Sequence, residues 1–134
     1  MKLQPDRIDV PAITAYGADW VAIQGRQQRN SVVLASTGEQ FDWPCSDFAD
    51  LTPEHFDALL ALPIEILILG TGAQQRFVRP SWLSGFMQRR MGVESMANDA
   101  ACRTYNILAS EGRRVAIALI LPGGAPEPVS APEA

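Results

Sequence analysis

The hydrophobic residues of the C-terminal half fall in runs that predict buried strands. The segment IEILILG, residues 64–70, is apolar almost throughout and does not alternate with polar residues. Such a run is typical of a central strand that is covered on both faces of a sheet. The segment RVAIALIL, residues 114–121, has the same character, and VESM, residues 93–96, predicts a shorter strand between them.

Capping residues and apolar spacing predict helices over residues 52–62, 80–91 and 98–111. Thr52 is a suitable N-cap for the first helix, and Pro53 suits its first position. Gly92 is expected to end the second helix, whose buried face would hold Trp82, Leu83, Phe86 and Met87. Asn98 is a good N-cap and Gly112 a good C-cap for the third. The order strand, helix, strand, helix, strand favours parallel pairing.

The first third of the chain predicts a small antiparallel β-layer. Val, Ile, Tyr, Trp and Thr alternate with turn residues, which indicates strands near residues 12–15, 20–24 and 31–36 and a turn over residues 25–30. We expect one domain over residues 1–122. Residues 123–134 are rich in Pro, Ala, Gly and acid, and we expect a disordered tail there.

Composition excludes several classes of protein. The chain has 134 residues and a net charge of -4, which argues against broad nucleic-acid binding. Two cysteines and one histidine are too few for a disulfide scaffold or a zinc site, so no metal is predicted. The start of the chain lacks an apolar signal segment, and no run is long enough to span a membrane. We therefore expect a soluble, cytoplasmic protein.

The charges are unevenly distributed along the sequence. Acidic residues alone supply the charge from Glu39 to Glu65, whereas arginines predominate from Arg76 to Arg114. A run of acidic residues is usually a solvated face. The arginine-rich half is the better candidate for binding an anion or a partner.

Three segments, LILGTG at 67–72, GVESM at 92–96 and ACRTYNILASEGRRVAIALILP at 101–122, resemble the Mth938-like family. This family consists of small proteins of unknown biochemical function, and its eukaryotic relative is the mitochondrial complex I assembly factor three. The resemblance covers residues 6–122. It implies a mixed α/β, three-layer fold, in which a mixed β-sheet with helices carries a small N-terminal antiparallel layer. It implies no established enzyme activity and no cofactor.

The Gly70-Thr71-Gly72 loop follows a predicted central strand, at the sheet edge where α/β proteins tend to bind ligands. The loop lacks the lysine of a Walker motif and the third glycine of a dinucleotide fingerprint, so a tight strand exit is the leading interpretation. A site for an anion or a partner is the alternative. Its candidate residues are Gly70, Thr71, Gly72, Arg76, Arg79, Asn98, Arg103, Tyr105 and Asn106.

No catalytic residue is predicted. Cys102 lacks a base nearby in the sequence and is expected to pack in the core, and His55 is expected to be a solvated first-turn residue. Trp82 is expected to be a core or rim residue; the alternative is that Trp82 and Phe86 extend into an exposed apolar patch, which would mark a partner site. The first hypothesis is a non-enzymatic binding or assembly module with an unidentified protein partner, either a monomer or a weak homo-oligomer. The second is a protein or enzyme that binds a small anion.

Overall fold

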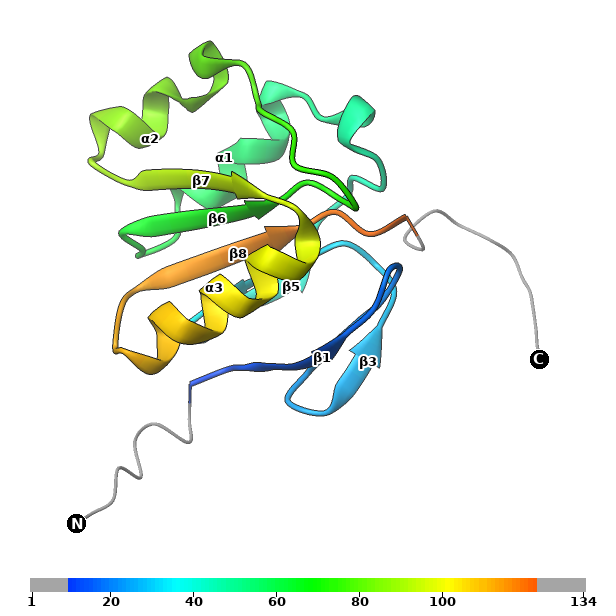
Figure 1. Ribbon diagram of the computed structural model, residues 1–134. Helices are drawn as coiled ribbons and strands as arrows, with labels where there is room; N and C mark the ends of the chain where they lie inside the picture. Colours follow the sequence, from blue (N-terminus) through cyan, green and yellow to red (C-terminus); the bar gives the residue numbers. More distant parts are fainter. Residues whose placement is uncertain (1–9, 123–134) are drawn as a thin grey trace.

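The computed structural model describes residues 10–122, which form two β-sheets and several short helices (Figure 1). The larger sheet has five strands in the order β5, β4, β8, β6, β7. These strands are β4 (Val32–Ala35), β5 (Gln40–Asp42), β6 (Ile66–Gly70), β7 (Gly92–Met96) and β8 (Val115–Leu119). β6 pairs in parallel with β7 and with β8, as predicted, whereas β4 runs antiparallel to β5 and to β8.

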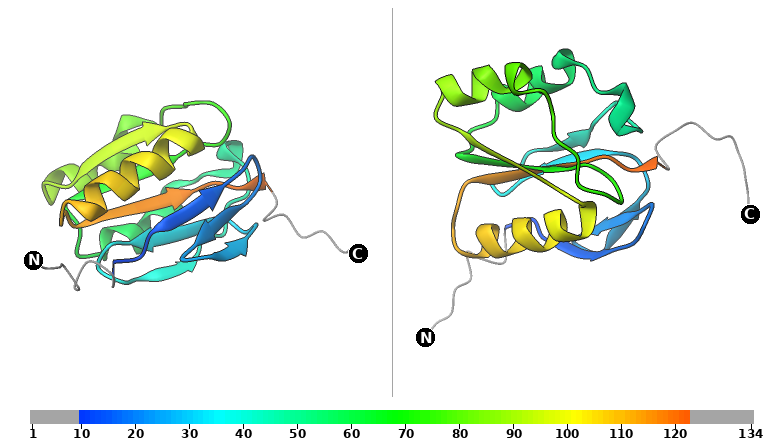
Figure 2. Two further views of the ribbon diagram at one scale, coloured as in Figure 1. Left: turned by 60° about the horizontal axis from the view of Figure 1, so that its bottom comes forward. Right: turned by 45° about the horizontal axis from the view of Figure 1, so that its top comes forward.

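Layers on the two faces of this sheet make the fold three-layered (Figure 2). On one face lie short helices: η2 (Phe48–Asp50), η3 (Pro53–Phe56), α1 (Asp57–Leu60), η4 (Pro80–Leu83) and α2 (Ser84–Gln88). On the other face lie α3 (Asn98–Ser110) and an antiparallel sheet of β1 (Ile13–Tyr16), β2 (Val21–Ile23) and β3 (Arg26–Gln28). The predicted mixed three-layer fold is confirmed.

β6 is an interior strand with apolar contacts on both faces, as its continuous apolar sequence predicted. Leu67 and Leu69 pack in the core under the short helices, together with Phe56. Ile68 points to the opposite face and packs in the second core, together with Tyr105 of α3. All three strand residues are 0% exposed, so β6 is shielded on both sides.

The predicted turn over residues 25–30 is wrong, because it contains β3. Gln24 and Gly25, with φ of 49° and 85°, form a two-residue hairpin turn between β2 and β3. The side chains of β3 are Arg-Gln-Gln, so the strand is recognised by its backbone pairing and not by hydrophobic alternation. The strand expected at 31–36 leaves the small layer and joins the main sheet as β4.

Two helices differ from their predicted form. The first begins with the 3-10 turn η3 and continues as α1. The second is η4 followed by α2, which ends at Gln88, and Gly92 is the first residue of β7 instead of the helix stop. Phe86 is buried as expected, but Met87 is 72% exposed because its side chain is on the outer face of α2.

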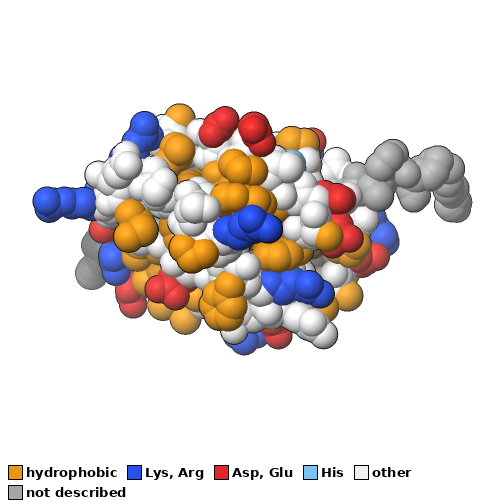
Figure 3. Space-filling view, turned by 90° about the horizontal axis from the view of Figure 1, so that it is seen from above, with side chains coloured by type: hydrophobic (Ala, Val, Ile, Leu, Met, Phe, Trp, Pro, Cys, Tyr) orange, Lys and Arg blue, Asp and Glu red, His pale blue; other side chains and the backbone are white. Residues whose placement is uncertain are grey.

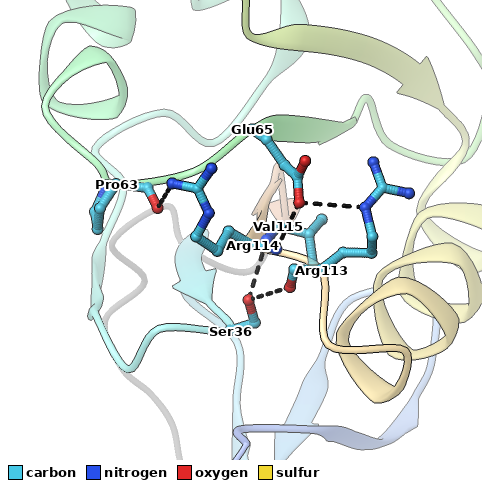
Figure 4. Close-up of polar contacts among 6 residues, drawn as sticks. All are labelled: Ser36, Pro63, Glu65, Arg113, Arg114 and Val115. Carbon is cyan, nitrogen blue, oxygen red and sulfur yellow. Dashed lines mark hydrogen bonds and ion pairs between the residues drawn. The ribbon is translucent and has the colours of Figure 1, made fainter.

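Glu65 holds the start of β6 against the start of β8 (Figure 4). Its Oε2 accepts hydrogen bonds from Arg114 N at 3.1 Å and from Arg113 Nε at 3.2 Å. These two donors, the backbone N–H first, lower the pKa of the Glu65 carboxyl. Ser36 completes the arrangement by donating to Arg113 O and accepting from Val115 N. Arg113 and Arg114 therefore serve the fold at the end of the sheet opposite the Gly-Thr-Gly loop.

Candidate functional site

The two glycines of the Gly-Thr-Gly loop are required by the backbone. A Cβ on Gly70 would lie 2.5 Å from Leu119 Cδ2 and 2.6 Å from Asn98 Oδ1, so both of these side chains would have to shift to admit any other residue. Gly72 has a φ of 106°, in the region that favours glycine. Close packing at Gly70 and the positive φ of Gly72 both favour glycine where the chain leaves β6, in agreement with the leading interpretation of the sequence.

Thr71 closes the loop from the inside. Its hydroxyl accepts a hydrogen bond from Arg76 N at 3.1 Å and donates to Gln74 O at 2.7 Å, and its own N–H donates to Met96 O at 2.9 Å. The residue is 3% exposed. The hydroxyl thus stabilises the loop conformation and is not directed toward solvent.

Asn98 joins three connections at the carboxyl edge of the sheet. Its Oδ1 accepts from Gly72 N at 3.0 Å, and its Nδ2 donates to Ile120 O, just after β8, at 2.9 Å. Its backbone N–H donates to Gly72 O at 2.8 Å. Because the side chain is engaged in this way, Asn98 is not the N-cap; Ala97 occupies that position. The prediction of Asn98 as the cap was wrong.

Tyr105 and Asn106 attach the small sheet to α3. The Asn106 side chain accepts from Ile13 N at 2.9 Å and donates to Ile13 O at 2.7 Å, so it pairs with the edge of β1 much as another strand would. Tyr105 is completely buried, and its hydroxyl donates to Pro11 O at 2.8 Å. Burial raises the pKa of this phenol. Both residues have a structural role in these contacts.

Arg103 lies beside a small cleft between the β1–β2 turn and the Gly-Thr-Gly loop. Its Nη1 donates to the Tyr16 hydroxyl at 3.1 Å and is 3.9 Å from Asp99 Oδ2. Tyr16, Gly72, Asn98 and Asp99 are among the residues that line the cleft, which has a volume of about 310 Å³. An acidic residue at its wall makes this cleft unfavourable for an anion.

Arg76 and Arg79 lie on the opposite side of the loop, among aromatic residues of the helical layer. The Arg76 guanidinium is 5.7 Å from the centre of the Phe48 ring, and that of Arg79 is 6.0 Å from the Trp82 ring, as in cation–π contacts. Phe77 lies between the two arginines in sequence and is 77% exposed, whereas Val78 is buried. We call Phe48, Arg76, Phe77, Arg79 and Trp82 the basic-aromatic surface.

Figure 3 shows the face of the molecule formed by the short helices. Hydrophobic side chains and the blue Lys and Arg side chains lie next to one another near its middle, and acidic side chains lie toward its margins. The two most exposed large hydrophobic side chains among residues 10–122, Phe77 at 77% and Met87 at 72%, both belong to this layer, and apolar side chains gathered on one face are typical of a contact surface. The helical face is therefore the strongest candidate for a contact surface.

Comparison with known proteins places the chain in a family. A family model described as "Protein of unknown function (DUF498/DUF598)" matches residues 13–120. The chain belongs to this family. A solution structure of a Mth938-like domain from Bordetella pertussis is similar, with a TM-score of 0.77, 29% sequence identity, and coverage of 92% of this chain and 94% of that one. The resemblance inferred from the sequence is confirmed.

Two similar proteins carry other names. The human protein "NADH dehydrogenase [ubiquinone] 1 alpha subcomplex assembly factor 3" is 34% identical over 91% of this chain and 67% of its own length. The "13 kDa major membrane protein" of Francisella tularensis is 27% identical over 90% of this chain and 99% of its own length. In four other vertebrate versions of assembly factor 3, the match spans only 45% to 50% of their length. Within residues 10–122 of the present chain, no helix is long and apolar enough to cross a bilayer.

The nine residues singled out from the sequence of this DUF498 member do not form one pocket. Thr71, Gly72 and Arg76 border an open depression of about 380 Å³, and Asn98 borders the smaller cleft. Tyr105 and Asn106 hold β1. Phe77 and Phe48 of the basic-aromatic surface were not among the candidate residues predicted from the sequence. An aromatic residue between two arginines in a loop was the available signal, whereas the expected patch residue Phe86 is 0% exposed.

His55 and Cys102 have structural positions. His55 Nδ1 accepts from Thr52 N at 2.9 Å, which leaves Nε2 to donate to Pro44 O at 2.8 Å. The ring is half-buried and bonded on both sides, so the expectation of a solvated first-turn residue was wrong. Cys102 is 1% exposed, as predicted, and burial raises the pKa of its thiol to about 12.

Proposed function

We propose that this protein is a binding or assembly module that docks a protein partner on the helical face, through the basic-aromatic surface. The observation that carries the proposal is the position of Phe77, which is 77% exposed and lies between two arginines that stack on other aromatic rings. Burying such a side chain in an interface is worth about 1.5–3 kcal/mol. Aromatic and arginine residues are also the types that most often dominate binding energy.

The contacts of Arg76 and Arg79 add to this support. Each guanidinium lies over a ring, so its long side chain has less freedom to lose when a partner binds. Arginines in this arrangement present hydrogen-bond donors in a defined direction. Kinship with human assembly factor 3, whose name states a role in assembling another protein complex, agrees with a module that acts by contact.

Affinity capture from a native lysate, with cross-linking and mass spectrometry, tests the proposal. We expect Phe77→Ser and Arg76→Ala to lose the proteins that the wild type captures. Ile107→Ser is the matched control, because Ile107 is also an exposed apolar residue, at 57%, but lies on α3 on the other face of the sheet. Capture of the same proteins by all four forms would rule the helical face out as the docking surface.

A small anion is the second candidate ligand, at the depression beside the loop. Arg76 and the Gly72–Gln74 backbone border it, which supports binding of a negatively charged group. Asp47 also borders it and opposes such binding. NMR titration with phosphate and sulfate should shift the amides of residues 72–76 if the depression binds anions. Unchanged spectra at millimolar anion would exclude this candidate.

A further inference from the structure

We propose that the helical face binds a second copy of this chain; this inference rests on the proposed function and names the partner for the same surface. Two sets of opposite charge lie on that face. The acidic set, on η2, η3 and α1, comprises Asp47, Asp50, Glu54 and Asp57. The basic set, on the loop before η4 and after α2, comprises Arg76, Arg79, Arg89 and Arg90.

Neither set is neutralised within the chain. Ion pairs within residues 10–122 join Arg29 to Asp19, Arg103 to Asp99 and Arg113 to Glu65, and none involves a member of either set. All eight side chains are exposed. Opposite charges that share a face and remain unpaired within one molecule are available to pair across an interface.

A two-fold axis would bring the two sets together twice. In a symmetric dimer the same surface is used by both copies, so the acidic set of one can face the basic set of the other and the reverse. The apolar side chains near the middle of this face, with the exposed Phe77 and Met87 in the same layer, would then be covered. A single partner, the second copy, would thus pair with both charge sets and cover the apolar side chains.

Other occupants match only part of this face. An anionic bilayer would attract the four arginines but repel the four carboxylates beside them. A uniformly acidic protein segment would meet the same repulsion. A second copy presents both signs of charge in equal number, and for this reason we choose it.

Charge reversal with a mixing test decides the question. Arg76→Glu/Arg79→Glu makes the face largely acidic, and Glu54→Arg/Asp57→Arg makes it largely basic. Sedimentation velocity at about 50 mM salt, where electrostatic screening is weak, should show concentration-dependent dimers for the wild type. Each variant alone should associate at least about tenfold more weakly, since like charges now face each other. An equimolar mixture of the two should recover a heterodimer.

A matched control separates the contact from a change in net charge. Arg26→Glu/Arg29→Glu alters the charge by the same amount as the acidic variant but lies on and beside β3, on the other face of the sheet. It breaks one exposed ion pair, which contributes little. We expect it to dimerise like the wild type.

A wild-type chain that stays monomeric up to about 100 μM, or a mixture that does not recover the dimer, would overturn the second copy as the partner. A dissociation constant above about 100 μM means binding too weak for a dedicated interface. Binding of the monomer to phosphatidylserine vesicles through its arginines would also overturn the second copy as the partner. Capture of other proteins that depends on Phe77, by a chain that remains monomeric, would refute the dimer and leave the proposed function standing.

Discussion

The two layers that cover the five-stranded sheet differ in how far their charged side chains are paired within the chain. On the α3 side, Asn106 and Tyr105 use their side chains to hold β1 and the segment before it. On the helical side, the acidic and basic sets are exposed and lack ion-pair partners among residues 10–122. A polar side chain that is bonded inside the chain stabilises the fold, and one that is left unpaired is available for contact. This difference supports the proposal that the helical layer is the docking side.

Removing the Asn106 pairing should give the largest effect on stability. Asn106→Leu leaves the buried N–H and C=O of Ile13 without partners, and the free energy of unfolding should fall by about 2–4 kcal/mol. Urea unfolding followed by circular dichroism measures the change. Ile107→Ala, at the next position on α3, is the control and should stay within about 0.5 kcal/mol of the wild type. Equal stability of the two variants would contradict a structural role for Asn106.

The alkylation rates of Cys45 and Cys102 show how readily each of the two layers opens. Cys102 is under α3 with a pKa of about 12, so about one thiol in ten thousand is ionised at pH 8. Cys45 also has a raised pKa, mainly because it is buried, but it borders an open depression of about 330 Å³. In a time course with iodoacetamide, we expect Cys45 to be alkylated at least about tenfold faster than Cys102. Peptide mapping that finds equal rates would show that the α3 layer opens as readily as the helical layer.

Substitutions on the basic-aromatic surface should have the smallest effect on stability. Phe77→Ser and Arg76→Ala alter exposed side chains, so the free energy of unfolding should change by no more than about 0.5 kcal/mol. Thermal and urea unfolding of both variants beside the wild type provide the measurement. A loss above about 1 kcal/mol would mean that this surface supports the fold and would remove the contrast between the layers.

The sequence predicted those elements that depend on neighbouring residues, such as an apolar run or a glycine at the end of a helix. The apolar runs of β6 and β8 indicated buried, parallel strands because both faces of each strand are covered. Gly112 was predicted as the C-cap of α3; the C-cap is Glu111, and Gly112 follows it with a φ of 83°, a conformation that favours glycine. These features follow from the residues themselves, so no knowledge of distant contacts was needed.

The features that could not be predicted from the sequence depend on pairing between residues that are far apart in the chain. β3 has polar side chains and exists because its backbone pairs with β2. Asn98 resembles a helix cap in its local context, but its amide bonds to Ile120, 22 residues away in the sequence. The candidate site was dispersed for the same reason: Arg76, Asn98 and Asn106 all carry side chains that can hydrogen-bond, and only their contacts distinguish a surface residue from two structural ones.

The bonds of Asn98 have a mechanical consequence. They tie the exit of β6, the first turn of α3 and the exit of β8 to a single side chain. The backbone at Gly70 is packed closely against Leu119 and Asn98, since a Cβ built there would overlap with both side chains. We expect these three connections to open together and not one at a time, because one side chain bonds to all of them.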